Sequence, residues 1–283
     1  MPHAVPTLAL RLALRALLAG PGRLDAPAEV ALRRAAGLAV DPHAEAEIDG
    51  LRARLAADTR AVDVVDYGAG SSRGDKATPR RVCDVAARAG TGPAWGRFLQ
   101  ALARELAPGA VLELGTNLGL GAAHLCAGLE VADARDPAGA PRRLVSLEGD
   151  PTFAELSRGA LAALGWADRA TVVTGRFADT LPDVLAAHGP FGLVFVDGHH
   201  AEAPALDYVA AVRPHLAPGA VVVLDDVEPT RPVRRAWTRL ASEPGARRRY
   251  LGKLGLLQFP SPDRAAARGG AVPAAARSPE IHA

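Results

Sequence analysis

Between residues 93 and 260 the sequence alternates short apolar runs with longer amphipathic segments, and this alternation restricts the possible folds more than any other feature. The apolar runs are residues 110–114, 143–147, 170–174, 191–196, 220–224, 249–251 and 254–259. Continuous Val- and Leu-rich runs are typical of strands that are buried on both faces, as in parallel sheets covered by helices. We therefore predict an α/β fold with a doubly wound, Rossmann-like sheet and right-handed crossovers.

The last two apolar runs differ from the others because only a short Gly-Lys turn separates them. A helical crossover needs about a dozen residues, so these runs are expected to form an antiparallel hairpin. One strand of the otherwise parallel sheet should consequently run antiparallel to its neighbours.

Composition divides the chain of 283 residues into three parts. Residues 1–92 are rich in Ala and Arg, have a helical pattern and are predicted to form an N-terminal helical cap or lid. Residues 93–260 form the predicted α/β domain. Residues 261–283 consist mostly of Ala, Arg, Gly, Pro and Ser and are predicted to be a disordered tail.

Charge, cysteine content and hydropathy exclude several classes of protein. A formal net charge of +2 gives no indication of a polyanionic partner. Two cysteines are too few for a disulfide framework or a four-thiolate zinc site. The apolar stretch 8–18 is interrupted by Arg11 and Arg15, and no run reaches about 18 uncharged apolar residues. We expect a cytoplasmic protein without membrane association.

A glycine-rich loop follows the first strand of the predicted domain, where open sheets of this kind bind their ligands. The loop extends from Glu113 to Gly121 with glycines in the order G-x-x-x-G-x-G. The dinucleotide-binding order is G-x-G-x-x-G, and a carboxylate beside the loop would repel a pyrophosphate. The loop therefore favours a ligand with an ammonium group, the alternative being a simple turn.

The second and third strands end in residues that are typical of nucleoside binding. Glu148 directly ends the second strand, where an acidic side chain can accept hydrogen bonds from ribose hydroxyls. Asp150, followed by Pro151, is assigned as the N-cap of the next helix. After the third strand, Phe177 either packs on an adenine ring or belongs to the core.

The fourth and fifth strands end in a concentration of ionisable residues. These are Asp197, His199, His200, Asp225 and Asp226. Three carboxylates and two imidazoles at one sheet edge are costly to bury, so a substrate, a cation or a water cluster is expected among them. The alternatives are that Asp226 caps a helix and that each histidine lies in a solvated loop.

Five motifs in register make the segment 94–259 resemble a class I S-adenosylmethionine (SAM)-dependent methyltransferase of the small-molecule O-methyltransferase type. They begin at Glu113, Glu148, Gly175, Val196 and Leu224. The resemblance implies a seven-stranded sheet in the order 3-2-1-4-5-7-6 with strand 7 antiparallel, and SAM as cofactor. It assigns cofactor contacts to Glu113, Gly115, Thr116, Asn117, Gly119, Glu148, Gly149, Arg176, Phe177 and Asp197.

Within that family the sequence is most similar to the catechol and caffeoyl-CoA O-methyltransferase branch. The branch implies a divalent cation such as Mg²⁺ on Asp197, Asp225 and Asp226, although this chain has Asp where the branch has Asn at the last position. His200 stands where the branch has a lysine base, so the implied catalytic residues are His200, His199 and Asp197. A small-molecule acceptor is the expected partner, and a homodimer is the candidate assembly.

An earlier segment, residues 65–72, has a similar acidic and glycine-rich pattern. The residues after it are too polar for the helix that a cofactor loop should open. We interpret it as part of a lid over the site, the alternative being a second binding loop.

Three other functions remain as hypotheses. One is a dinucleotide-dependent oxidoreductase, which the glycine spacing disfavours, and one is a degenerate module that binds the cofactor without catalysis. The third is an RNA-modifying or nucleic-acid-binding protein, suggested by Arg231, Arg234, Arg235, Arg239, Arg247, Arg248 and Arg249. Because only Lys76 and Lys253 among the 33 basic residues are lysine, arginine is frequent throughout the chain, and a solvated helix face is the preferred interpretation.

Overall fold

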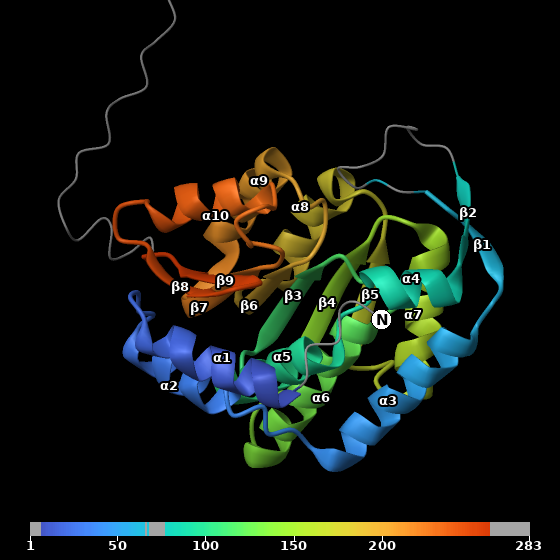
Figure 1. Ribbon diagram of the computed structural model, residues 1–283, viewed down its shortest axis with the longest axis horizontal. Coiled ribbons are helices and arrows are strands. Elements are labelled where there is room, and N and C mark those ends of the chain that lie inside the picture. Colours follow the sequence, from blue (N-terminus) through green and yellow to red (C-terminus); the bar gives the residue numbers. More distant parts are fainter. Residues whose placement is uncertain (1–6, 66, 68–76, 261–283) are drawn as a thin grey trace, which may run out of the picture.

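A seven-stranded sheet forms the centre of the computed structural model, which describes residues 7–65, 67 and 77–260 (Figure 1). The strands are β3 (Ala110–Leu114), β4 (Arg143–Glu148), β5 (Ala170–Thr174), β6 (Phe191–Val196), β7 (Leu216–Leu224), β8 (Arg247–Leu251) and β9 (Leu254–Gln258). Their order is β5-β4-β3-β6-β7-β9-β8, and β9 runs antiparallel to both of its neighbours. Counted from β3, this is the predicted order 3-2-1-4-5-7-6, so the prediction of the fold is confirmed.

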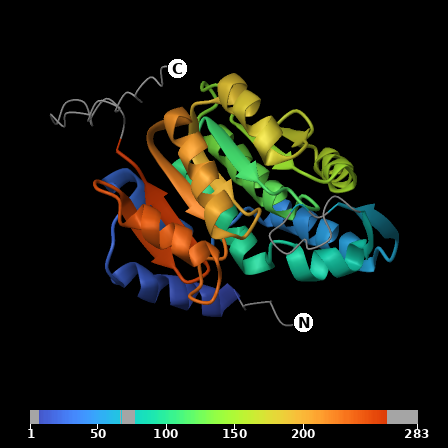
Figure 2. The same ribbon diagram turned by 90° about the horizontal axis from the view of Figure 1, so that it is seen from above.

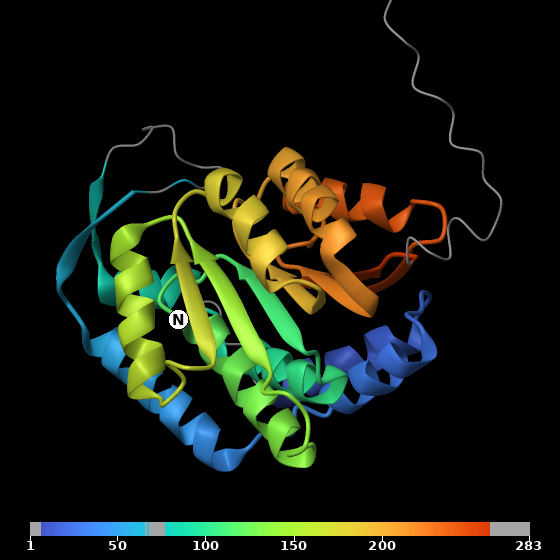
Figure 3. The same ribbon diagram turned by 180° about the vertical axis from the view of Figure 1, so that it is seen from behind.

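Helices cover both faces of the sheet, as Figures 1 and 3 show. One side carries α5 (Pro93–Leu106), α6 (Leu120–Arg135) and α7 (Pro151–Ala163). The other side carries α8 (Phe177–His188), α9 (Glu202–Val212) and α10 (Val233–Ala241), with α9 next to α10 (Figure 2). A 3₁₀ turn, Arg213–His215, connects α9 to β7.

Alternate residues of each strand enter two different cores. In β6, Leu193 and Phe195 pack on the α5 and α6 side, whereas Val194 and Val196 pack on the α8 and α10 side. All four side chains are buried. Two-sided burial therefore explains why the strands read as unbroken apolar runs in the sequence.

The N-terminal helices form an outer layer on the first of these cores. They are α1 (Thr7–Ala19), α2 (Ala26–Ala35) and α3 (Pro42–Ala57). Leu14, Leu32 and Ile48 are fully buried and belong to the same apolar cluster as the sheet residues. Helix α2 packs on α5 and α3 packs on α6, so these three helices extend the core beneath the sheet (Figure 1).

A second segment of the N-terminal region, from β1 (Ala61–Val64) to α4 (Val82–Ala89), reaches the edge of the sheet where the parallel strands end. β1 pairs with β2 (Thr78–Arg81) in a small antiparallel ladder, which the polar sequence of β2 did not indicate. The Val65 amide donates to Asp150 Oδ2 at 2.7 Å. Of the predicted loop at residues 65–72, only Val65 and Tyr67 lie within the described residues, and the predicted tail at 261–283 lies outside them.

None of the described helices combines the length and the apolar character needed to cross a membrane.

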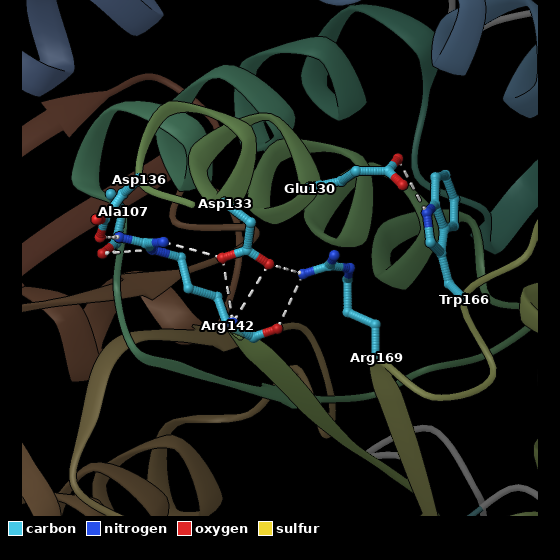
Figure 4. Close-up of polar contacts among 7 residues, drawn as sticks. All are labelled: Ala107, Glu130, Asp133, Asp136, Arg142, Trp166 and Arg169. Atoms are coloured by element: carbon cyan, nitrogen blue, oxygen red, sulfur yellow. Dashed lines mark hydrogen bonds and ion pairs between the residues drawn. The ribbon is translucent and has the colours of Figure 1, made fainter. Parts of the chain in front are cut away.

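An ion-pair network holds the opposite edge of the sheet together (Figure 4). Asp133 near the end of α6 lies between Arg142, which precedes β4, and Arg169, which precedes β5. Arg142 Nη1 donates to Asp133 Oδ1 at 2.9 Å, and Arg169 Nη1 donates to Asp133 Oδ2 at 2.5 Å. Nearby, Trp166 Nε1 donates to Glu130 Oε2 at 3.2 Å. These contacts fix α6 against the starts of two parallel strands.

We expect Asp133→Ala to lower the free energy of unfolding by about 2 kcal/mol, since it leaves two partly buried guanidinium groups without their shared acceptor. Burial raises the pKa of Asp133, but hydrogen bonds from Arg169 and Arg142 outweigh burial and lower it. The stabilisation that Asp133 provides should therefore be fully present at pH values above its ordinary pKa of 3.8. It should be lost as the pH falls through the lowered pKa of the folded protein. Urea unfolding at pH 7 and pH 3 tests this. If the free energies of unfolding of wild type and Asp133→Ala differed by the same amount at both pH values, the prediction would be wrong.

Candidate active site

The loop after β3 packs directly on the ends of the neighbouring strands. Gly115 has φ +106°, and a Cβ there would lie 2.6 Å from the carbonyl oxygen of Asp197. Gly119 has φ +84°. Asn117, with φ +51°, also lies in the left-handed region, which Asn tolerates better than most residues. Glycine is thus required at 115, where the chain turns sharply against the end of β6.

Glu148, at the end of β4, ties two loops together. Its Oε2 accepts from the Asn117 amide at 2.7 Å, and its Oε1 accepts from the Asp150 amide at 2.9 Å. Burial raises the pKa of Glu148, although these amide hydrogen bonds oppose the shift. Asp150 caps α7 as predicted, because its Oδ1 accepts from the Phe153 amide at 2.8 Å.

The side chains of Glu113 and Thr116 both contact Ser146 on β4. Glu113 is 1% exposed and accepts from Ser146 Oγ at 2.5 Å, and the Thr116 hydroxyl lies 2.5 Å from the same Ser146 oxygen. Burial raises the pKa of Glu113 to about 8, despite the opposing hydrogen bond from Ser146. Gly121 on α6 leaves the room for this carboxyl, since a Cβ there would lie 2.6 Å from Glu113 Oε1. Glu113 thus supports the loop from below.

Asn117 carries a buried polar atom with no partner among the described residues. Its Nδ2 donates to the Ala89 carbonyl at 3.1 Å, whereas its Oδ1 is buried without a hydrogen bond. Leaving a buried acceptor unpaired costs about 1–3 kcal/mol. A ligand with an N–H or O–H donor would remove that cost. The glycine loop, this acceptor and Glu148 therefore fit a ligand such as SAM.

Tyr67, which sequence analysis did not single out, covers the ends of β4 and β5. The Arg176 guanidinium lies 4.9 Å from the centre of its ring. A Cβ on Gly149 would lie 2.7 Å from a carbon of the same ring. These contacts place an aromatic side chain from the N-terminal region beside Gly149 and Arg176, two residues for which we predicted cofactor contacts.

Phe177 lies in the core that contains α8 and α9. Its ring packs edge-on against Tyr208, with 5.5 Å between ring centres, and against His199 at 6.2 Å. A Cβ on Gly198 would lie 2.7 Å from the Phe177 ring. The position matches the core alternative, and an adenine contact at Phe177 stays a prediction.

The three aspartates converge as expected, but they enclose a lysine. Lys253 Nζ donates to both carboxylate oxygens of Asp225 and lies 3.0 Å from Asp226 Oδ1. Burial, then the Asp225 carboxylate, raises the pKa of Asp197 well above its ordinary value. Burial also raises the pKa of Asp226, but Lys253 outweighs it and lowers the pKa.

The residues present do not fit a divalent cation on the three aspartates, because the ammonium group of Lys253 already binds Asp225 and Asp226. In the described part of the chain, no three or more His, Cys, Asp or Glu side chains are placed to hold a metal ion. The sequence contained one indication that Lys253 would lie near the aspartates. Since β9 runs antiparallel to β7, the turn before β9 must lie at the end of β7, where the aspartates are.

The two histidines after β6 face different groups. His200 Nδ1 lies 3.5 Å from Asp226 Oδ2, and His200 Nε2 lies 3.9 Å from Asp197 Oδ1. The His200 side chain is 46% exposed, so a small molecule can reach it. His199 has φ +57°, and its Nδ1 lies 2.5 Å from the Tyr208 hydroxyl. The structure thus groups His200 with the aspartates and places the His199 ring beside Tyr208.

The arginine cluster near the C-terminal strands makes contacts within the protein. Arg249 is buried against Glu29, and Arg235 Nε binds Glu202 Oε2 at 2.5 Å. The Arg234 guanidinium lies over the rings of Trp237 and Tyr250. Other contacts join Arg247 to the Leu24 carbonyl, Arg248 to the Ala241 carbonyl and Arg239 to Glu202. Six of the seven arginines of the cluster, all except Arg231, thus have side-chain contacts within the protein.

Comparison with known proteins agrees with this geometry. Residues 112–227 match a family model described as a methyltransferase domain. Over 132 residues, the chain is 39% identical to a catechol O-methyltransferase of Mycobacterium tuberculosis (strain ATCC 25618 / H37Rv). That match covers 47% of this chain and 54% of the relative. The chain spans about half the length of the curated relatives it matches.

Solved structures show the same fold. Cofactor-bound Rv0187 from MTB aligns with a TM-score of 0.55 and 24% identity, over 84% of this chain and 99% of that one. An O-methyltransferase from Bacillus cereus in complex with S-adenosylhomocysteine (SAH) aligns with a TM-score of 0.52 and 21% identity, over 77% of this chain and 90% of that one. At these identities, the likeness concerns the fold.

Proposed function

We propose that this chain, which carries a methyltransferase domain over residues 112–227, transfers the methyl group of SAM to a hydroxyl oxygen of a small molecule. The observation that carries the proposal is the β3 loop, where Gly115 and Gly119 have positive φ, and where the side-chain Oδ1 of Asn117 is buried without a partner among the described residues. Catechols are the acceptors to assay first, since a matched relative is a catechol O-methyltransferase.

The protein residues of this site have three tasks in the proposed reaction. When bound, SAM supplies an activated methyl group, so the protein mainly has to align the reactants and handle one proton. The β3 loop and Glu148 would hold the cofactor, and Glu148 would accept hydrogen bonds from the ribose hydroxyls. His200 accepts the proton of the acceptor hydroxyl, because it is partly exposed and its ring lies between Asp197 and Asp226. Asp197 and Asp226 orient the imidazole.

Calorimetry with the full-length protein tests the proposal directly. SAH is expected to bind in the micromolar range, and NADH at the same concentrations is expected to give no saturable heat. Saturable binding of NADH without binding of SAH would instead favour the oxidoreductase hypothesis, which the glycine order of the loop opposes.

We expect Glu148→Ala to weaken SAH binding about 30-fold, which corresponds to about 2 kcal/mol for a lost charged hydrogen bond. Glu148→Gln should lose less, since its amide keeps one acceptor for the loop. Glu155→Ala, which removes an exposed carboxylate from α7, is the matched control and should bind SAH like wild type. Thermal unfolding of each variant separates lost binding from lost structure. Unchanged SAH affinity in Glu148→Ala would remove the assigned role.

We also propose a cytoplasmic location, because Cys83 and Cys126 are both free thiols. The homodimer stays a prediction.

A further inference from the structure

The backbone holds the turn before β9 next to the aspartates. Leu224, the last residue of β7, pairs with Gly255, so the turn at 252–253 lies beside the end of β7. Gly252 has φ +81°, as a two-residue hairpin turn requires at its first central position. The Val227 amide donates to the Lys253 carbonyl oxygen at 2.9 Å. The position of Lys253 is therefore fixed by the sheet and by a tertiary hydrogen bond.

The side chain of Lys253 is directed into the acidic cluster. Its ammonium group donates to both oxygens of Asp225, whose side chain is 8% exposed, and lies 3.0 Å from Asp226 Oδ1. An ammonium group has three donors, and these three oxygens match them. Burial lowers the pKa of Lys253, but the surrounding carboxylates, Asp225 first, outweigh burial and raise it. Lys253 is thus a permanent cation at this position.

A divalent cation would need the same oxygens. Mg²⁺ binds oxygen ligands at about 2.0–2.1 Å in near-octahedral geometry and brings several of its own waters. The oxygens of Asp225 are engaged by Lys253, and the positive charge of the ammonium group repels a second cation. A metal ion can therefore enter only if Lys253 leaves.

We propose that the Lys253 ammonium is the resident cation of Asp197, Asp225 and Asp226, so that the native protein binds no divalent cation there. It follows, on the basis of the proposed function, that methyl transfer by this protein does not need a divalent metal. Lys253 is a positioning residue in this scheme. It neutralises and orients the carboxylates that flank His200.

Binding of Mn²⁺ to metal-free full-length protein, followed by the electron paramagnetic resonance signal of free Mn²⁺, tests the proposal without any turnover. Wild type is expected to bind no Mn²⁺ saturably up to about 1 mM, on the scale of weak carboxylate sites. Lys253→Ala leaves three carboxylates without a counter-ion and should bind Mn²⁺ at least tenfold more tightly. Adding Asp225→Asn to Lys253→Ala should remove that binding. If Lys253→Ala does not fold, Lys253→Gln serves in its place.

Saturable binding of Mn²⁺ by wild type that Asp225→Asn abolishes would overturn the proposal, because the metal would then displace Lys253. The absence of Mn²⁺ binding in both lysine variants would also overturn it, since Lys253 would not be what excludes the ion. SAH calorimetry on the same samples reports the proposed function separately. Wild type that binds SAH and keeps its turnover in EDTA supports both proposals, and wild type that binds neither SAH nor Mn²⁺ contradicts only the proposed function.

Discussion

Replacing His200 with alanine is expected to lower kcat about 100- to 10,000-fold, the usual contribution of a general base. The reason is its placement, since His200 lies 3.5 Å from Asp226 and 3.9 Å from Asp197 and remains partly exposed. The affinity for SAH should stay within about twofold of wild type, because the β3 loop and Glu148, which hold the cofactor in the proposed function, lie at other strand ends. The measurement is steady-state methylation of a catechol acceptor together with SAH calorimetry.

The neighbouring histidine provides the matched control. His199→Asn keeps a residue that accepts φ +57° but loses the imidazole beside Tyr208. We expect it to lower thermal stability and to reduce kcat by less than tenfold. Added imidazole should restore part of the activity of His200→Ala and leave His199→Asn unchanged. Equal losses in the two variants, with no rescue, would show that His200 does not accept the proton.

The family resemblance implied the strand order. The residues themselves were sufficient to predict an α/β sheet with an antiparallel hairpin and the edge at which the candidate site lies. Both depend on local signals, namely apolar runs, glycine turns and acidic residues directly after strands. Glu148 and Asp150 illustrate this, since each acts within a few residues of its own strand end. The convergence of Asp197, Asp225 and Asp226 followed from the parallel order alone.

Contacts between distant segments could not be predicted in the same way. Lys253 occupies the aspartate cluster because a hairpin turn and the end of β7 meet in the sheet. Tyr67 lies beside Gly149 although 82 positions separate them, and no spacing rule connects the two. Arginine was so frequent that Arg249 looked like its solvated neighbours, whereas it is 2% exposed. The partner that makes its burial possible is Glu29, 220 positions away.

Glu29→Ala is expected to lower the free energy of unfolding by about 3–5 kcal/mol, as loss of one partner of a buried ion pair usually does. Glu29 Oε1 accepts from Arg249 Nε at 2.6 Å, and Oε2 accepts from Arg249 Nη2 at 2.9 Å. Arg249 Nη1 also donates to the Gly20 carbonyl oxygen at 3.0 Å, so β8 is joined to α2 and to the residue that follows α1. Without Glu29, the guanidinium group stays buried with one carbonyl oxygen as its remaining acceptor among these partners.

Two comparisons isolate this pair in urea unfolding. Arg33→Ala removes an exposed arginine that lies 3.7 Å from Glu29, and it should cost less than about 1 kcal/mol because surface ion pairs contribute little. The double variant Glu29→Met, Arg249→Leu removes both charges together and should recover most of the loss.

The stabilisation by this pair should depend on pH. Burial raises the pKa of Glu29, but Arg249 and the Leu24 amide outweigh burial, so that the pKa is lowered. The stabilisation should therefore be complete above the ordinary value of 4.5 and disappear as the pH falls through the lowered pKa. A loss below 1 kcal/mol in Glu29→Ala at pH 7 would mean that the Glu29–Arg249 pair contributes little to holding the N-terminal helices against the sheet.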